Sequence, residues 1–385
     1  MNKIENVTKH PSLWEGLGRL FLIFLLIHLS FSYAVAQSWP KATQEAKAGA
    51  RWWWLGSAVD KENLQWNLKQ YADHGIGTVE ITPIYGVQGN QDNNIPYLSD
   101  KWMEMLRYTQ EQCKENDIEL DMATGTGWPF GGPWVPLEES ACKVLFVDTA
   151  FTGKTVEGLL LQVPEKDRKY SRLQKVMAYG PTGAVDVTSA VQDGLLSWKA
   201  PKGTKKQDEW RVIAVFIRYG VMKVKRAAPG GEGLVIDHFD RKAVGNYLRH
   251  IEEAFERTNT PYPHTFFNDS YEVSEATWTP TLFEEFEKRR GYKLEEHLPE
   301  LLAQTQPIPD YSPLSQVETG RGTVRSLLCD YRETLGDLLL ENFTLPRRAR
   351  SSTASTCSLI RLERVCMSGI PRDTRRPTSS AGTRG

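Results

Sequence analysis

Residues 266–272 have the sequence FFNDSYE. This stretch is the most informative one for the fold, because its apolar residues are followed by two acids, Asp269 and Glu272. The segment that follows, FEEFEKRRGY over 283–292, spaces its apolar residues as an amphipathic helix does. This order of strand, loop and helix, with acids where the strand ends, is typical of α/β barrel enzymes, which keep their chemistry at that edge. The alternative is that such acids cap the next helix or face solvent in a loop.

The aromatic neighbours of the second acid strengthen the functional interpretation. Tyr271 and Trp278 bracket Glu272 in the sequence. Rings stack on the apolar face of a sugar, and rings that desolvate a carboxylic acid raise its pKa. The combination indicates a sugar-binding cleft in which Glu272 is a candidate catalytic residue.

The rest of the chain alternates strand-like and helix-like blocks, which is the pattern of parallel sheets and barrels. The clearest strands are predicted at 49–55, 78–82 and 118–123, and the clearest helices at 60–75 and 100–116. Asp60 stands at an N-cap position and Gly75 at the stop of the first helix. We therefore expect an α/β fold built around a parallel sheet.

Glycines and rings gather after the third predicted strand, in the loop TGTGWPFGGPW at 124–134. The glycines allow backbone amides to approach a ligand closely, and the loop lacks the Lys-Ser/Thr ending of a phosphate loop. The run Trp52–Trp54 should place at least one ring on each face of a strand. Core packing is the simple alternative for these rings.

The pattern of apolar and polar residues changes near Lys143, and the new pattern predicts an inserted antiparallel β subdomain. From there to about Glu232, apolar and polar residues alternate with period two between turn-forming residues. The alternation of strands and helices returns with LVIDHF at 234–239, where Asp237 and His238 follow the apolar run. For His238, a buried histidine satisfied by its surroundings is as good an interpretation as a substrate contact.

The N-terminal sequence predicts that the protein is exported. Basic residues precede an apolar run from Leu20 to Phe31, and Ala34-Val35-Ala36 supplies the small residues that a signal peptidase cleaves after. We predict a signal peptide over 1–36. A membrane anchor is the alternative, but the run is shorter than the roughly 20 residues that a spanning helix needs.

Composition argues against other classes of protein. The net charge is −1, so no electrostatic argument favours nucleic acid as a partner. The five cysteines show no C-x-x-C or zinc-like spacing, and their odd number implies no disulfide framework.

An ordered series of motifs resembles the N-terminal part of glycoside hydrolase family 106, the α-L-rhamnosidases, over roughly Ala50 to Pro346. The motifs are WWW at 52–54 with Gly56, HGIG at 74–77, GTGWP at 125–129, VIDHF at 235–239, and DSYE at 269–272 with RRGY at 289–292. The resemblance implies a (β/α)8 TIM-type barrel decorated with β domains and an inverting mechanism. It also implies a calcium ion at the active site, a rhamnose-containing oligosaccharide or polysaccharide as partner, and secretion to the bacterial periplasm or cell surface.

An inverting glycosidase needs two carboxyl groups roughly 6.5 to 9.5 Å apart, one as acid and one as base. Glu272 is the expected acid, and the second carboxylate is expected beyond the matching region. Asp269, one turn earlier, is better placed to orient a ligand, bind calcium or hydrogen-bond Glu272. Further candidate sugar contacts are Asp237, His238, Thr124, Trp128 and Glu80, for each of which a structural role stays open.

The last segment departs from the family pattern. From Arg347 onward the chain holds nine Arg against Glu363 and Asp373, with no Lys, no aromatic ring and no periodicity. A disordered basic tail is one interpretation. We favour a reading-frame shift near codon 346, and we expect a chain so altered to express poorly and to hydrolyse nothing.

The expected organisation is a signal peptide (1–36), a first part of the barrel (37–142), the β subdomain (143–232), a continuation of the barrel (233–346) and the tail (347–385). Because about five strand-helix units can be counted, the barrel is expected to be incomplete in this chain. Two alternatives to a rhamnosidase stay open: a non-catalytic glycan-binding protein, and a glycosidase of other sugar specificity on the same barrel.

Overall fold

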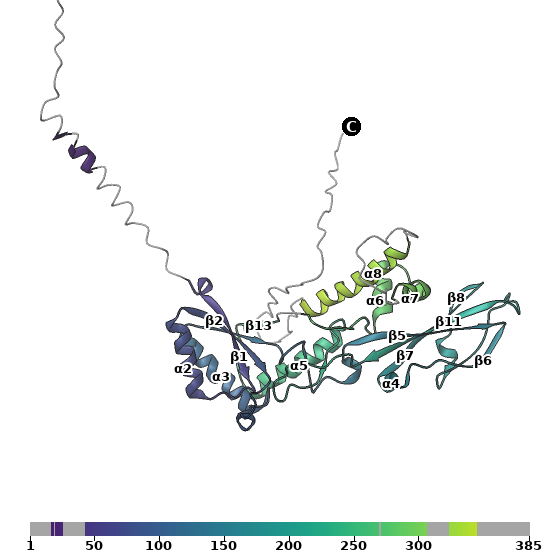
Figure 1. Ribbon diagram of the computed structural model, residues 1–385, viewed down its shortest axis with the longest axis horizontal. Helices are drawn as coiled ribbons and strands as arrows, with labels where there is room; N and C mark the ends of the chain where they lie inside the picture. The colour runs from purple at the N-terminus through teal and green to yellow at the C-terminus, as the bar shows by residue number, and fades with distance from the viewer. Residues whose placement is uncertain (1–16, 19, 26–42, 269–270, 306–322, 345–385) are drawn as a thin grey trace, which may run out of the picture. The chain divides into compact units, whose positions relative to one another are not determined.

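The computed structural model describes residues 17–18, 20–25, 43–268, 271–305 and 323–344 (Figure 1). The chain divides into two units, Met1–Lys47 and Ala48–Gly385. In the first unit, residues 20–25 are helical and exposed, and a short 3-10 helix η1 spans Gln44–Ala46. Most of the predicted signal peptide, including the expected cleavage site after Ala36, lies outside the described residues, as does the tail from Arg347 onward.

The second unit is built on a parallel sheet of four strands in the order β1-β2-β3-β13. Its strands are β1 (Ala48–Leu55), β2 (Ile76–Ile84), β3 (Glu119–Ala123) and β13 (Thr265–Phe267). Each strand pairs with its neighbour in parallel. The three strands predicted at 49–55, 78–82 and 118–123 are therefore confirmed, and they lie side by side.

Three helices connect these strands: α2 (Lys61–Asp73), α3 (Asp100–Glu115) and α5 (Arg241–Thr258). Side-chain caps set their starts, because the carboxylate of Asp60 accepts the amide of Asn63 at 2.9 Å and the hydroxyl of Ser99 accepts the amide of Trp102 at 3.2 Å. Such caps satisfy backbone donors that the first helical turn leaves without partners. The helices predicted at 60–75 and 100–116 are confirmed.

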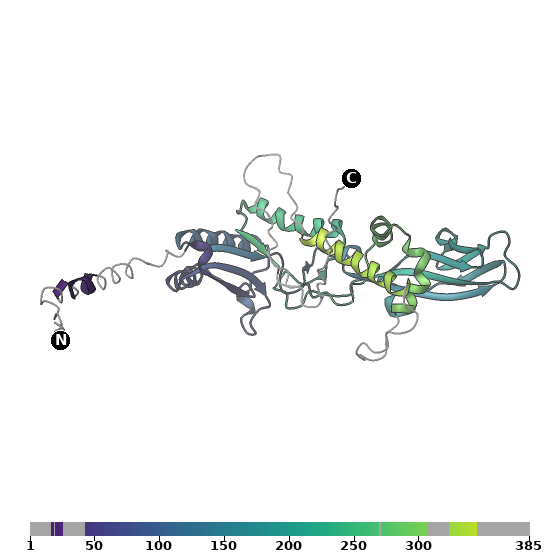
Figure 2. The same ribbon diagram turned by 90° about the horizontal axis from the view of Figure 1, so that it is seen from above.

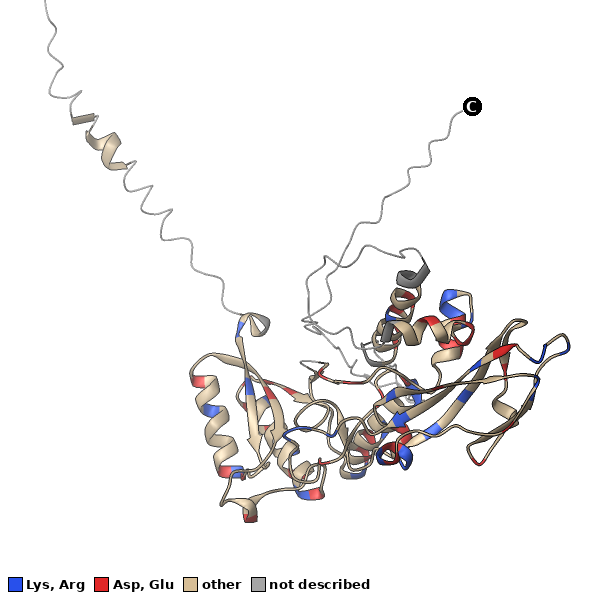
Figure 3. Cartoon of the chain, turned by 45° about the vertical axis from the view of Figure 1, so that its right-hand side comes forward, with Lys and Arg blue, Asp and Glu red and all other residues tan. Residues whose placement is uncertain are grey.

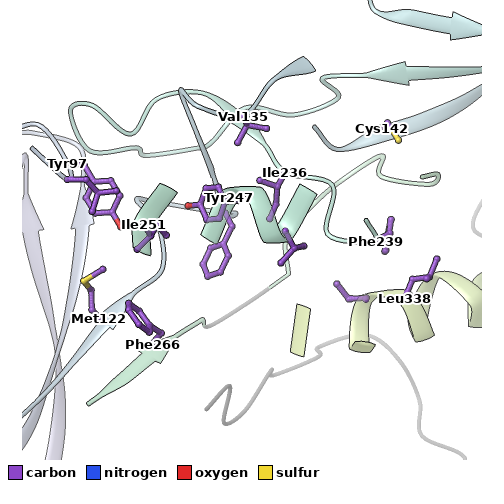
Figure 4. Packing of buried hydrophobic residues seen from close by; sticks show 14 of the residues in the cluster. Tyr97, Met122, Val135, Cys142, Ile236, Phe239, Tyr247, Ile251, Phe266 and Leu338 are labelled. Carbon is purple, nitrogen blue, oxygen red and sulfur yellow. The ribbon is translucent and has the colours of Figure 1, made fainter. Parts of the chain in front are cut away.

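The two faces of the parallel sheet differ in character. The face toward the helices is apolar and buried, and it carries Trp52, Trp54, Val79, Ile81, Leu120, Met122 and Phe266. In Figure 4, Met122 and Phe266 meet Ile251 of α5 and the ring of Tyr97 in this core. Alternation along β1 turns the ring of Trp53 to the opposite face, where it is 42% exposed.

The segment between β3 and α5 contains seven strands of an antiparallel β structure. These strands are β5 (Cys142–Thr152), β6 (Thr155–Leu160), β7 (Ser171–Gly180), β8 (Gly183–Asp186), β9 (Val191–Gln192), β10 (Leu195–Lys199) and β11 (Glu209–Tyr219). They form two sheets, in the orders β5-β11-β7-β8 and β6-β10-β9. Val176 of β7, Leu196 of β10 and Trp210 of β11 share one buried cluster, so the two sheets pack face to face.

Short elements complete this part of the chain. They are η2 (Gln91–Asn93), β4 (Gly131–Gly132), η3 (Leu137–Glu139), α4 (Glu165–Arg168), η4 (Thr188–Ala190) and β12 (Leu234–Val235).

One sequence-based expectation is wrong, namely that residues 234–239 add a strand to the parallel sheet. β12 instead pairs antiparallel with β4. The glycines of β4 make this close pairing possible, since a Cβ at Gly131 would stand 2.2 Å from the carbonyl oxygen of Leu234. The parallel sheet of the described residues therefore has four strands, where about five strand-helix units were expected.

Among the described residues after β13 there are four helical elements and a π-helix: α6 (Leu282–Arg290), η5 (Leu294–His297), α7 (Leu298–Thr305), α8 (Thr323–Leu339) and η6 (Leu340–Thr344). Helix α8, yellow-green in Figure 2, packs against α6 and α7. Ion pairs join these elements, because Arg290 of α6 contacts Asp337 at 2.8 Å and Arg289 contacts Glu341 at 2.7 Å.

Candidate active site

A pocket opens on the face of the parallel sheet that the helices do not cover. Its lining comes from all four parallel strands and from the loops after β3 and β13: Arg51, Glu80, Thr82, Ala123, Gly127, Trp128, Pro129, Phe130, Phe267 and Asn268. The carboxyl ends of parallel strands are where α/β enzymes bind their ligands. Two residues predicted as sugar contacts, Glu80 and Trp128, line this pocket together.

The carboxylate of Glu80 is held by two donors. Arg51 is its direct neighbour in the register of β1 and β2, and the Arg51 Nε donates to Glu80 Oε2 at 3.3 Å. The hydroxyl of Thr82 donates to Glu80 Oε1 at 2.7 Å. The Arg51 guanidinium also lies 5.2 Å from the ring centroid of Phe267. This arrangement fixes an acceptor and a donor beside an aromatic ring, which are the groups that recognise sugar hydroxyls and a sugar's apolar face.

The ring of Trp128 forms the aromatic side of the pocket. Its centroid lies 5.7 Å from that of Trp53, the exposed ring of β1. The loop is fixed by a bridge to the segment after β11, because the Trp128 amide donates to the Lys225 carbonyl at 2.9 Å and the Lys225 amide donates back at 2.7 Å. Gly127, at φ +57, permits this approach, since a Cβ there would stand 2.0 Å from the Lys225 carbonyl oxygen.

Asn268 adds a polar group that points to ligand binding. It lines the pocket and is 8% exposed, and its Nδ2 is buried with no hydrogen-bond partner among the described residues. A buried amide without a partner costs free energy unless something else accepts its protons. A hydroxyl group of a bound ligand would supply such an acceptor.

Thr124 does not belong to the pocket lining. Its side chain is buried, and its carbonyl oxygen accepts the hydroxyl of Tyr247 of α5 at 2.9 Å. The same hydroxyl reaches the carbonyl of Gly131 at 3.3 Å. Helix α5 thus fixes both ends of the glycine-rich loop, and the structure gives Thr124 a supporting position.

Asp237 and His238 are buried away from the pocket lining. The backbone amide of Phe239 donates to Asp237 Oδ1 at 2.9 Å, and the thiol of Cys142 lies 4.0 Å from Oδ2. Burial raises the pKa of Asp237 to about 7. Burial lowers the pKa of His238 to about 3, so the ring is neutral, and its Nδ1 contacts the Ile236 carbonyl at 3.0 Å.

His238 contacts two rings near the pocket. It stacks at 6.4 Å on Phe130, which lines the pocket, and meets Tyr271 edge-on at 5.1 Å. The structure therefore places neither Asp237 nor His238 in the lining, and the carboxylate of Asp237 lies instead beside Cys142 at the start of β5.

The side chain of Glu272 is exposed, so the expected desolvation by Tyr271 and Trp278 does not occur in this structure. Trp278 is fully buried instead, and its indole Nε1 donates to Gln174 Oε1 at 2.8 Å. The ring turns inward because it packs against Phe283 at 5.3 Å. Asp269 lies outside the described residues.

Several lining residues were not predicted from the sequence, among them Arg51, Thr82, Phe267 and Asn268. Strand alternation carried a signal for the first two, because Arg51 shares a face with Trp53, and Thr82 shares a face with Glu80. Asn268 stands within the stretch that was singled out for its two acids.

No group of three or more His, Cys, Asp or Glu side chains that could hold a metal occurs among the described residues. The calcium ion implied by the family resemblance therefore finds no ligand cluster there. Across the same residues, no helix has the length and apolar character needed to cross a bilayer.

The fold and the pocket define an α/β enzyme scaffold with an inserted β sandwich and an aromatic, carboxylate-bearing site at the strand ends. The family model described as alpha-L-rhamnosidase matches residues 40–179 and 165–349, and the chain belongs to this family, glycoside hydrolase family 106. The resemblance found in the sequence motifs is thereby confirmed.

Known proteins resemble the chain over most of its length. A Formosa agariphila protein named "Putative beta-glucuronidase" is 27% identical over 344 residues, covering 78% of this chain and 28% of that protein. The solved structure of a rhamnosidase from Novosphingobium sp. PP1Y matches with a TM-score of 0.60 at 18% identity, covering 79% of this chain and 45% of the other. The chain thus spans less than half the length of either relative.

Proposed function

We propose that this chain carries the substrate-binding part of an exported glycoside hydrolase that removes terminal α-L-rhamnosyl residues from plant-type polysaccharides. The observation that carries the proposal is the pocket at the strand ends, where Trp128, the Arg51–Glu80 pair and the unsatisfied amide of Asn268 converge. Family membership supplies the reaction class. Periplasmic or cell-surface location, a calcium ion and a (β/α)8 barrel that is incomplete in this chain are further parts of this proposal.

The pocket groups have complementary tasks. The Trp128 ring stacks on the apolar face of the sugar, while Glu80 and Asn268 accept and donate hydrogen bonds at its hydroxyls. Rhamnose has a methyl group in place of a hydroxymethyl group, so a ring-lined wall favours it over more polar sugars. Binding energy from these contacts holds the glycosidic bond in a fixed orientation for proton transfer.

In the proposed inverting reaction, Glu272 donates a proton to the leaving oxygen. The side chain of Glu272 is exposed and does not belong to the pocket lining, so this role rests on the family resemblance of the DSYE motif. A second carboxylate takes a proton from the attacking water on the opposite face of the sugar. No described residue is assigned to that role.

The test uses an intact homologue with a complete barrel, because this chain is expected to hydrolyse nothing. It compares that homologue with its variant Glu272→Gln, numbered as here, using a chromogenic α-L-rhamnoside for turnover and calorimetry for sugar binding. Glu272→Gln is expected to abolish turnover and to leave binding unchanged, because glutamine keeps the shape but has no proton to donate at this position. Glu275→Gln, three residues further along the same segment, is the matched control. Full turnover in Glu272→Gln would remove Glu272 from the mechanism.

A glycosidase of other sugar specificity is the second candidate, and the name of the Formosa agariphila relative favours it. A panel of chromogenic glycosides separates the two candidates. Turnover of a β-glucuronide with none of the α-L-rhamnoside would replace the first proposal by the second. Sugar binding without turnover of any glycoside would leave a glycan-binding protein.

A further inference from the structure

Two basic residues stand beside the pocket on the segment that braces the glycine-rich loop. Lys225 and Arg226 are both exposed, and neither has an ion pair among the described residues. Elsewhere basic and acidic residues are interspersed (Figure 3), and several basic residues of the inserted sheets are paired, as Arg211 is with Asp148 at 2.7 Å. Lys225 and Arg226 instead present their positive charge to solvent beside the pocket.

The backbone geometry aims Lys225 toward the pocket side of the loop. Lys225 and Trp128 exchange both of their backbone hydrogen bonds, so they are directly opposed residues of an antiparallel bridge. Side chains of directly opposed residues lie on the same face of the pair. The ammonium group of Lys225 thus shares a face with the ring that lines the pocket.

Arg226 extends the positive charge along the edge of the sheet. Its guanidinium lies 5.9 Å from the ring centroid of Tyr85, which follows β2 and is 44% exposed. The backbone of Arg226 is in the left-handed region at φ 58, and its carbonyl accepts the amide of Tyr85 at 3.1 Å. A non-glycine residue costs free energy in that conformation, and such strain is concentrated at functional sites.

These features form one surface, which we call the basic rim: Lys225, Arg226, Tyr85, Trp53 and Trp128. Exposed rings bind sugar faces, and unpaired cations beside them bind anionic substituents. The rim adjoins the pocket, because Trp128 belongs to both and Gly127 of the lining touches the backbone of Lys225 and Arg226.

We propose that the basic rim binds a negatively charged sugar, carrying a carboxylate or a sulfate ester, next to the rhamnosyl unit held in the pocket. This inference rests on the proposed function and specifies its substrate class as an anionic glycan. The positive charge also raises the local concentration of an acidic polysaccharide and its rate of association, an effect that salt screens.

The test measures binding of three rhamnosyl disaccharides to the full chain by calorimetry. One carries a uronate, the second is the uncharged methyl ester of that uronate, and the third carries a sulfate ester. With two unit charges about 6 Å from the anion in water, the anionic sugars should bind about tenfold more tightly than the ester. The ratio of these affinities should fall severalfold when the salt concentration rises from 0.05 M to 0.5 M.

The double variant Lys225→Gln/Arg226→Gln should bind the anionic sugars and the ester equally. Each single variant should lose about a third to a half of the difference in binding free energy between them. The matched control, Lys202→Gln/Lys206→Gln, makes the same change of charge on an exposed loop of the inserted sheets and should keep the preference. Melting curves show whether each variant is folded. Comparison of the uronate with the sulfate identifies which anion the rim prefers.

Equal binding of the uronate and its ester, or a preference that survives in the double variant, would overturn this inference while leaving the proposed function intact. Absence of binding for all three disaccharides would refute the proposed function itself, and the inference with it.

Discussion

Replacing Gly127 by alanine should disrupt the pocket through a single methyl group. Gly127 has a φ of +57, and a Cβ built there would stand 2.0 Å from the carbonyl oxygen of Lys225 and 2.7 Å from the backbone of Arg226. Because normal contacts need more than 3 Å, the two segments must separate by about 1 Å, which breaks the two hydrogen bonds between Trp128 and Lys225. Two bonds at about 1 kcal/mol each, with about 1–2 kcal/mol for the left-handed conformation, give about 3–4 kcal/mol.

Gly75→Ala separates conformational strain from overlap. Gly75 also has a positive φ, +80, yet a Cβ there meets nothing within 4 Å. It should therefore lower the free energy of unfolding by only about 1–2 kcal/mol.

The assay is urea unfolding of wild type, Gly127→Ala and Gly75→Ala, followed by calorimetric titration of each protein with methyl α-L-rhamnoside. Gly127→Ala should cost about 2 kcal/mol more than Gly75→Ala and should weaken sugar binding, which Gly75→Ala leaves unchanged. Equal stability losses, or unchanged binding in Gly127→Ala, would refute the reasoning that the bridge positions Trp128.

Two further predictions concern charged groups. Glu80→Gln removes the charge that faces Arg51 and should weaken rhamnoside binding about tenfold, as expected for loss of a charge-assisted hydrogen bond worth about 1.5 kcal/mol; the exposed Glu157→Gln is its control, and unchanged binding would exclude Glu80 from the site. Asp237 has its folded-state pKa raised to about 7, above the unfolded value, so its contribution to stability is complete below about pH 4 and is lost, at up to about 1.4 kcal/mol per pH unit, as the pH rises to 7. Asp237→Asn should abolish that part of the pH dependence in urea unfolding between pH 4 and 8, whereas an undiminished slope would assign it to other groups.

The elements that the sequence predicted correctly are those with local signals. Helices α2 and α3 combine a capping side chain, an apolar face and a stop, all contained within the segment itself. Strand β1 was equally recognisable, because its alternation places Trp52 and Trp54 on one face and Trp53 on the other.

The misassigned strand at 234–239 shows that local sequence signals do not predict which strand it pairs with. The run at 234–239 is apolar enough for a strand, but the choice of partner depends on the glycines of β4, about a hundred residues earlier in the chain. Periodicity describes the faces of a segment and cannot specify which distant segment covers them.

Only some residues of the candidate site were predictable from the sequence. Glu80 and Trp128 were found because both belong to strand or loop patterns at an expected sheet edge. The burial of Asp237 was not predictable, since it results from Cys142 and Phe239 closing around the carboxylate, and Cys142 lies 95 residues away in sequence. The Arg51–Glu80 pair required the parallel register of β1 and β2, which no local pattern reveals.

The most direct measurement for the central claim is calorimetric titration of wild type and Trp128→Ala with methyl α-L-rhamnoside, with Trp66→Ala as the control for loss of an exposed ring on the outer side of α2. We predict saturable binding by wild type and by Trp66→Ala, and binding at least tenfold weaker in Trp128→Ala, in line with the roughly 1–3 kcal/mol that a stacking ring contributes. Binding by wild type that Trp128→Ala leaves unchanged, or no saturable binding by wild type, would contradict the assignment of this pocket as the sugar site.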